Sequence, residues 1–134
     1  MMRILVVALL CQGSLAMAQE AIAPLEPLEP TVALPDATIA AGGVVRVLDK
    51  SSGETLDLEL QAGQTGSMGA LTVTLDECRY PTSNPSGDAF EHLTIRYRDA
   101  TDPVFAGWMI ASSPALNAMD HPRYDVWALR CSTS

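Results

Sequence analysis

Apolar residues occupy every second position in several short stretches, and this pattern limits the fold more than any other feature of the chain. Residues 55–60 (TLDLEL), 71–76 (LTVTLD) and 93–98 (LTIRYR) are the clearest examples. A period of two places the apolar side chains on one face of a β-strand. Turn-forming residues separate these stretches every 8–12 positions. We therefore predict an all-β domain of about six to seven strands, an antiparallel sandwich or a partly closed barrel.

Three local patterns refine this prediction. Residues 104–111 (VFAGWMIA) are nearly all apolar, which favours a central strand buried on both faces. Ser113 and Pro114 are typical of a helix start, so one short helix is expected near residues 114–119. In the last strand, alternation places Trp127 and Cys131 on the same face.

The first eighteen residues read as a signal peptide. Arg3 precedes an apolar run, and Ala16 and Ala18 form an A-x-A exit. The run is too short to span a membrane, and lipidation of Cys11 is the alternative. Cleavage near Ala18 would send the mature protein to the periplasm or the medium, with no membrane span.

Residues 19–41 are rich in proline and small residues and repeat Leu-Glu-Pro. Such density favours extended polyproline II, so we interpret this segment as a spacer before a β domain at residues 42–134. A disordered N-terminus without a task and a proline-rich ligand for a partner are the alternatives.

Two cysteines, Cys78 and Cys131, remain after the signal peptide. An even number in an exported protein predicts a disulfide, worth about 4 kcal/mol for a loop of this length. A bulge or a strand end near Asp76 and Glu77 would turn Cys78 inward. A catalytic or metal-binding thiol is the alternative, but the chain has no C-x-x-C motif.

The chain has 16 acidic and 8 basic residues, and Arg3 leaves with the signal peptide, so the mature net charge is −9. This excess of acidic residues disfavours binding to nucleic acid and to anionic membranes. The two histidines, His92 and His121, lie in separate segments, so we predict neither a metal site nor a cofactor.

Two groups of residues are candidates for a site. Ser112 or Ser113 with His121 could serve a hydrolase, although no G-x-S-x-G motif surrounds either serine. Aromatic and neighbouring side chains of the last forty residues could form a binding patch, which would comprise Trp108, Met109, Ser113, His121, Tyr124 and Trp127.

Four segments resemble an uncharacterised bacterial family, domain of unknown function 2155. They are residues 45–50 (VRVLDK), 78–81 (CRYP), 107–116 (GWMIASSPAL) and 121–127 (HPRYDVW). The resemblance covers about two thirds of the chain. It implies export in Gram-negative bacteria and assigns no activity and no catalytic residues.

We therefore expect a non-enzymatic periplasmic β module that binds or stabilises another component, such as a protein, of the cell envelope. The alternatives are the hydrolase and a small-ligand binder in a barrel mouth. The hydrolase would need His121 within about 3.2 Å of a serine oxygen, and the ligand binder a cavity of at least about 300 Å³. The sequence does not indicate the oligomeric state.

Overall fold

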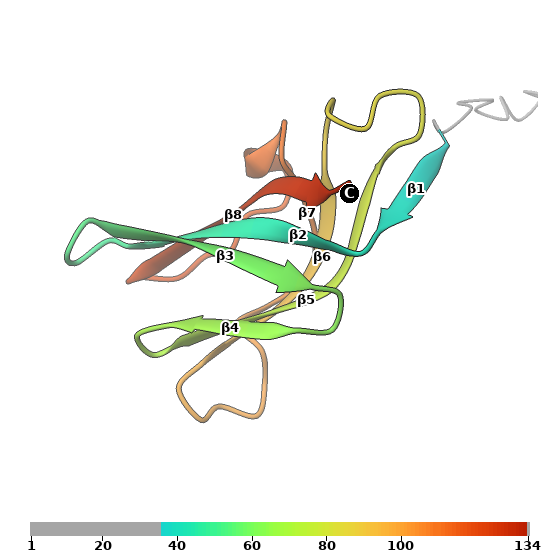
Figure 1. Ribbon diagram of the computed structural model, residues 1–134. Helices are drawn as coiled ribbons and strands as arrows, with labels where there is room; N and C mark the ends of the chain where they lie inside the picture. Colours follow the sequence, from blue (N-terminus) through green and yellow to red (C-terminus); the bar gives the residue numbers. More distant parts are fainter. Residues whose placement is uncertain (1–35, 134) are drawn as a thin grey trace, which may run out of the picture. The chain divides into compact units, whose positions relative to one another are not determined.

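The computed structural model describes residues 36–133, which form eight strands in two antiparallel sheets and one 3₁₀ turn (Figure 1). The elements in chain order are β1 (Ala37–Ala40), β2 (Gly42–Asp49), β3 (Glu54–Gln61), β4 (Thr65–Met68), β5 (Leu71–Pro81), β6 (Phe90–Tyr97), β7 (Phe105–Ile110), η1 (Pro114–Leu116) and β8 (Tyr124–Ser132). The all-β prediction is confirmed.

The larger sheet has the order β1-β5-β6-β7, and β4 pairs with the other end of β5. The smaller sheet has the order β3-β2-β8. The chain passes from one sheet to the other three times: between β1 and β2, where one residue separates the strands, between β3 and β4, and between β7 and β8. The two sheets do not close into a barrel, so the domain is an open sandwich.

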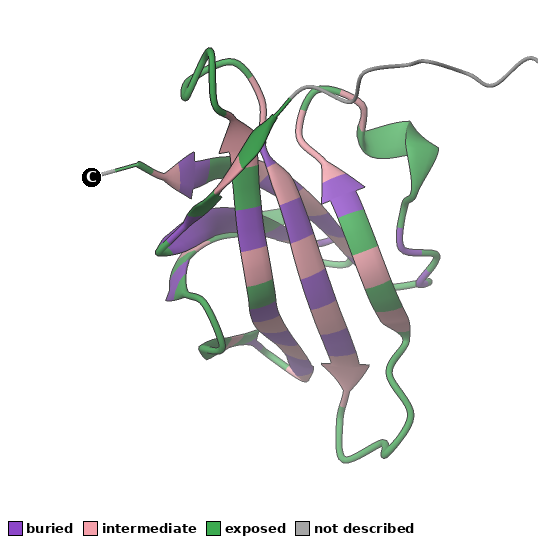
Figure 2. Cartoon of the chain, turned by 90° about the vertical axis from the view of Figure 1, so that its right-hand side faces the viewer, coloured by how far each residue is buried: buried purple, intermediate pink, exposed green. Residues whose placement is uncertain are grey.

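The core lies between the facing sides of the two sheets. In β5 and β6, buried residues alternate with partly exposed ones, as Figure 2 shows along these strands. Leu71, Val73 and Leu75 of β5 are fully buried, as are Leu93 and Ile95 of β6. Burial of one such side chain contributes about 1.5–3 kcal/mol. The apolar residues of the alternating pattern therefore supply the main force that holds the sheets together.

The apolar run of residues 104–111 forms an edge strand, and the prediction of a central strand buried on both faces was wrong. β7 pairs with β6 alone, and Trp108 on its outer side is 36% exposed. Its inner residue Met109 is buried. Apart from Met109, the residues of this strand are partly or fully exposed, so no further layer covers its outer side.

The short helix expected near residues 114–119 is a 3₁₀ turn of three residues. Ser113 precedes it without a side-chain cap hydrogen bond. Asn117 ends the turn, and its side-chain amide donates to the Trp108 carbonyl at 2.8 Å. This bond ties the loop to the edge strand in place of a second helical turn, and it satisfies one carbonyl of the exposed edge.

The sheet begins before residue 42. Ala37–Ala40, which the sequence analysis assigned to the spacer, form β1 and pair with β5 from Cys78 to Pro81. Ala40 is part of the core. The expected signal peptide and the remainder of the spacer up to residue 35 lie outside the described residues. β1 and β4, each of four residues, are the two strands that alternation did not predict.

Candidate functional site

A β-bulge in β5 turns Cys78 toward the core. The pairing of β5 with β6 shifts between Leu75 and Glu77, so Asp76 is the extra residue. Leu75 and Cys78, which are three positions apart, both have no exposed surface. The bulge predicted near Asp76 and Glu77 from the change of alternation is therefore confirmed.

A second bulge, in β8, turns Cys131 toward the core. Val45 of β2 pairs with Ala128 and the preceding Val44 with Arg130, so the pairing passes over Leu129. Cys131 therefore faces inward with Ala128. The prediction that Cys131 shares a face with Trp127 was wrong, because alternation cannot be counted through an extra residue.

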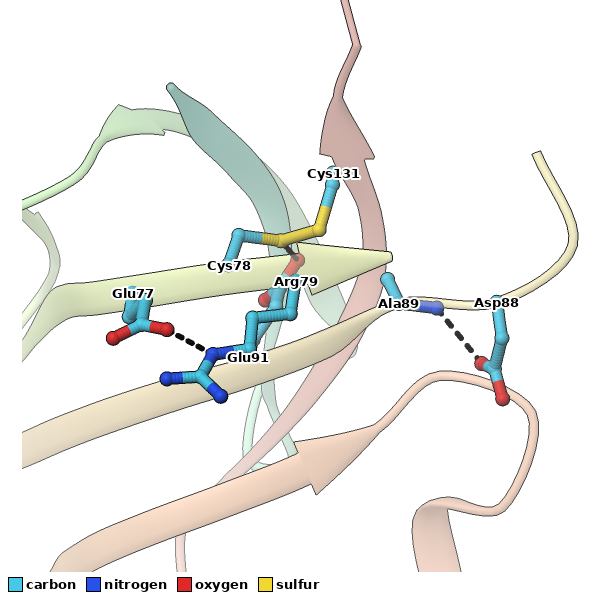
Figure 3. Close-up of a disulfide and its surroundings, with 7 residues drawn as sticks. All are labelled: Glu77, Cys78, Arg79, Asp88, Ala89, Glu91 and Cys131. Atoms are coloured by element: carbon cyan, nitrogen blue, oxygen red, sulfur yellow. Dashed lines mark hydrogen bonds and ion pairs between the residues drawn. A yellow bond between two sulfur atoms is a disulfide. The ribbon is translucent and has the colours of Figure 1, made fainter. Parts of the chain in front are cut away.

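The two cysteines form a disulfide that joins the sheets. The Sγ atoms of Cys78 and Cys131 are 2.05 Å apart and the Cα atoms 5.7 Å apart (Figure 3). Cys78 lies in the larger sheet and Cys131 in the smaller one. Cys78 has no exposed surface, whereas Cys131 is 8% exposed. The predicted disulfide is confirmed, and its two cysteines differ in exposure.

Glu91 lies beside this disulfide with no exposed surface. It is the pairing partner of Cys78 in β6, and its Oε1 is 3.8 Å from Cys78 Sγ. Its Oε2 is buried without a hydrogen-bond partner. Burial raises the pKa of Glu91 to about 8, and a backbone hydrogen bond from Val44 opposes only part of this rise. Glu91 is therefore protonated at neutral pH, and only this form can donate toward a disulfide sulfur, which carries no hydrogen.

A cleft of about 380 Å³ opens next to Cys131. Its lining includes Ser86, Asp88 and Ser112. Asp88 accepts a 2.6 Å hydrogen bond from Ser112 Oγ and bonds from the backbone amides of Ser112 and Ala89. These bonds fix the loop before β6 against the end of β7, so one wall of the cleft is held in place.

The outer face of the larger sheet carries an apolar groove of about 470 Å³, which we call the outer-face groove. It is lined by Ala37, Arg79, Phe90, Trp108 and Ile110. These residues come from β1, β5, β6 and β7, which register places side by side.

A network of polar side chains borders the outer-face groove. The Arg79 guanidinium lies 5.2 Å from the centre of the Trp108 ring and is ion-paired with Glu77. The hydrogen bond with Glu77 is the main cause of the raised pKa of Arg79. The His92 ring packs edge-on against Trp108 at 5.2 Å, and Asp76 Oδ2 lies 3.0 Å from His92 Nδ1. The exposed tryptophan thus contacts two side chains that are themselves anchored.

The six residues of the predicted binding patch do not share one surface. Trp108 lies in the outer-face groove, and Trp127 lies on the other sheet as the pairing partner of Arg46. Met109, Tyr124 and His121 are buried. Ser113 is half-buried at the start of η1. The structure thus brings only Trp108 into the groove.

His121 is held in a turn by the backbone. Its Nδ1 accepts hydrogen bonds from the amides of Arg123 and Tyr124 at 3.1 and 3.2 Å. Among the described residues, no hydrogen bond joins His121 to Ser112 or Ser113, and the hydroxyl of Ser112 donates to Asp88. The nucleophile and base that a serine hydrolase needs are therefore not assembled in this geometry.

Arg79, Phe90 and Glu91 were missed by the sequence analysis. Glu91 could have been found, because extending the alternation of Ile95 and Leu93 backward by two residues places it on the buried face. Arg79 and Phe90 meet Trp108 only through strand pairing across long chain separations, which no local pattern reveals.

Within residues 36–133, His, Cys, Asp and Glu side chains do not gather in groups of three that could hold a metal ion. In the same part of the chain, no helix has the length and hydropathy needed to cross a membrane.

Fold and site define an open antiparallel β-sandwich in which the Cys78–Cys131 disulfide joins the sheets and the buried carboxyl of Glu91 contacts it. The chain belongs to the family described as "Uncharacterized protein conserved in bacteria (DUF2155)", which matches residues 43–131. The family resemblance found in the sequence is therefore confirmed.

A similar protein is "Uncharacterized protein RP359" of Rickettsia prowazekii (strain Madrid E), which is 29% identical over 92 residues. The match covers 66% of this chain and spans 59% of the length of that relative. The comparison with solved structures gives no match.

Proposed function

We propose that this protein is an exported, non-enzymatic β module that binds another component of the bacterial cell envelope through the outer-face groove. The observation that carries the proposal is the exposed Trp108, which lies in an apolar groove on the outer side of the edge strand β7. Ile110 on the same strand and Phe90 on the neighbouring β6 also line this groove, and Ile39, which pairs with Arg79, is 63% exposed.

The side chains of the groove suit an interaction site. Tryptophan and arginine contribute disproportionately to protein interfaces, especially where an aromatic ring fills an apolar pocket on the partner. Trp108 and Arg79 are in contact here and are held by Glu77 and His92, so little side-chain entropy is lost when a partner binds.

Charge narrows the chemistry of the partner. The chain has a formal net charge of −8, and the acidic side chains of Asp76 and Glu77 border the groove. A partner segment with apolar side chains and neutral or positive charge would be attracted, and an acidic one would be repelled. This supports a protein partner in the envelope over nucleic acid or an anionic lipid surface.

The signal-like N-terminus supports export, and the disulfide supports an oxidising compartment such as the periplasm. Both are consistent with an envelope partner, because the protein would meet it only after crossing the inner membrane.

The test is photo-crosslinking in intact cells of the source bacterium. A photoreactive residue replaces Ile110 in the groove or, as a control, Thr55 on β3, which is exposed and belongs to the other sheet. The proposal predicts one crosslinked species from position 110 and none of that size from position 55.

The same experiment with tryptophan variants tests the groove itself. Trp108→Ala should abolish the crosslink, whereas Trp127→Ala, which removes the same side chain from the other sheet, should leave it. Equal crosslinking in both variants would contradict binding through the groove.

A further inference from the structure

The carboxyl of Glu91 and the sulfur of Cys78 share one enclosed space. The backbone of β2 closes this space at Gly43, where an added Cβ would lie 2.9 Å from both Cys78 Sγ and Glu91 Oε1. Only glycine leaves room for the two side chains to meet there. Met109 of β7 pairs with Glu91 from the other side and is buried. The carboxyl of Glu91 and the sulfur of Cys78 are thus in contact at a fully buried position.

No other charged side chain faces this pair among the described residues of the surrounding strands. The ionisable side chains next to Glu91 and Cys78 along these strands are 30–62% exposed and lie on the outer faces of the sheets. They are Arg46 of β2, Glu77 and Arg79 of β5, His92 of β6 and Arg130 of β8. Asp49 of β2 and Tyr124 of β8 are buried, but they pair with each other at the opposite end of those strands. Among the described residues, Glu91 therefore has no ionic partner, and the side-chain atom in contact with its Oε1 is Cys78 Sγ.

The two sulfurs are not equivalent to an incoming reagent. Cys131 lines the cleft of about 380 Å³ beside Asp88 and Ser112, whereas Cys78 has no exposed surface. A thiol that enters the cleft can reach Cys131. The leaving sulfur would then be Cys78, the one in contact with Glu91.

We propose that the Cys78–Cys131 disulfide is a thiol-exchange site for a dithiol and that Glu91 is the general acid of its reduction. The thiolate of the dithiol attacks Cys131 Sγ and forms a mixed disulfide. The Cys78–Cys131 bond breaks, its electron pair goes to Cys78 Sγ, and this sulfur takes the proton of the Glu91 carboxyl.

The second sulfur of the dithiol then loses its proton to solvent, closes the disulfide of the reagent and releases Cys131 as a thiolate. The dithiol is oxidised by two electrons. The protein holds a Cys78 thiol, a Cys131 thiolate and an ionised Glu91.

The proton transfer matters because a bare thiolate at Cys78 would be buried without a charge partner, which is costly. Burial raises the pKa of Glu91 to about 8, so this carboxyl still holds its proton at neutral pH, when the leaving sulfur needs one. A positioned acid commonly accelerates a reaction by about 100-fold or more.

The test is the rate of disulfide reduction by dithiothreitol between pH 6 and 10, expressed per molar reagent thiolate. The proposal predicts a constant rate up to about pH 8, where Glu91 keeps its proton, and a tenfold fall for each pH unit above it. Glu91→Gln should be about 100-fold slower at pH 7 and independent of pH. Glu77→Gln, which changes an exposed carboxyl one residue from Cys78, should keep the wild-type profile.

Reduction through prior unfolding would give the opposite trend. The wild-type rate per thiolate would then rise between pH 6 and 8, because ionisation of Glu91 favours the unfolded chain. Such a rise would overturn the proposal, and so would a Glu91→Gln profile that matches the wild type.

Discussion

Replacing Glu91 by glutamine should change how the stability of the domain depends on pH. The carboxyl has its ordinary pKa of 4.5 in the unfolded chain and a pKa of about 8 in the folded one, because burial disfavours its charged form. Because the folded chain holds this proton more tightly than the unfolded chain, the contribution of Glu91 to stability is fully present below pH 4.5. That effect is lost progressively as pH rises to about 8.

The size of this effect follows from the linkage relation. Each pH unit between 4.5 and about 8 lowers the free energy of unfolding by about 1.4 kcal/mol, so the loss reaches about 3 kcal/mol at pH 7. Glutamine has the shape of the protonated acid and does not ionise. Its amide leaves buried donors unpaired at a cost of about 1–3 kcal/mol, but this cost does not vary with pH.

The assay is urea unfolding, with the disulfide intact, at several pH values from 4.5 to 8.5. The difference in unfolding free energy between Glu91→Gln and wild type should move in favour of the variant by about 3 kcal/mol from pH 4.5 to 7. Glu77→Gln is the matched control, because Glu77 is paired with Arg79 on the outer face. Parallel curves for Glu91→Gln and wild type would refute the idea that a buried, protonated Glu91 governs this pH range.

Cys131→Ser should lower the free energy of unfolding by about 4 kcal/mol in a urea titration, because it removes a disulfide between cysteines 53 positions apart. An unchanged midpoint of unfolding would contradict this. Asp49→Asn should lower the melting temperature at neutral pH, because hydrogen bonds from Arg123 hold the pKa of Asp49 well below its usual range. The difference in melting temperature between variant and wild type should shrink below pH 4, where Asp49 begins to be protonated in the unfolded chain. A difference that stays constant with pH would argue against the ion pair. Gly69→Ala should lower the melting temperature more than Gly53→Ala, although both glycines have positive φ. The reason is that a Cβ at position 69 would lie 2.6 Å from the Tyr124 hydroxyl, whereas a Cβ at position 53 would meet nothing within 4 Å. Equal losses in thermal melts would show that φ alone matters.

The parts of the fold predicted from the sequence are those set by local alternation. Leu71, Val73 and Leu75 revealed β5, and the need to turn Cys78 inward revealed its bulge. β1 was not predicted, because Ala37–Ala40 are only four residues that follow a proline-rich segment and are ordered by pairing with distant residues.

The candidate site was less predictable, because it depends on which sheet faces are left open. An apolar run such as residues 104–111 does not show whether a second layer covers its outer side. The face that Trp108 shares with Arg79 exists only once β5, β6 and β7 are aligned. Glu91 was overlooked because a carboxylate suggests a surface position, although its place in the alternation indicates burial.

The Cys78–Cys131 disulfide joins the two sheets of the domain, and we propose that the domain is exported. Intact mass analysis of the folded protein, isolated from the periplasm under thiol-blocking conditions, tests both points most directly. The account predicts the mass of residues 19–134 less two hydrogen atoms, with no blocked thiol. A folded protein that keeps residues 1–18 or carries two blocked thiols would contradict it.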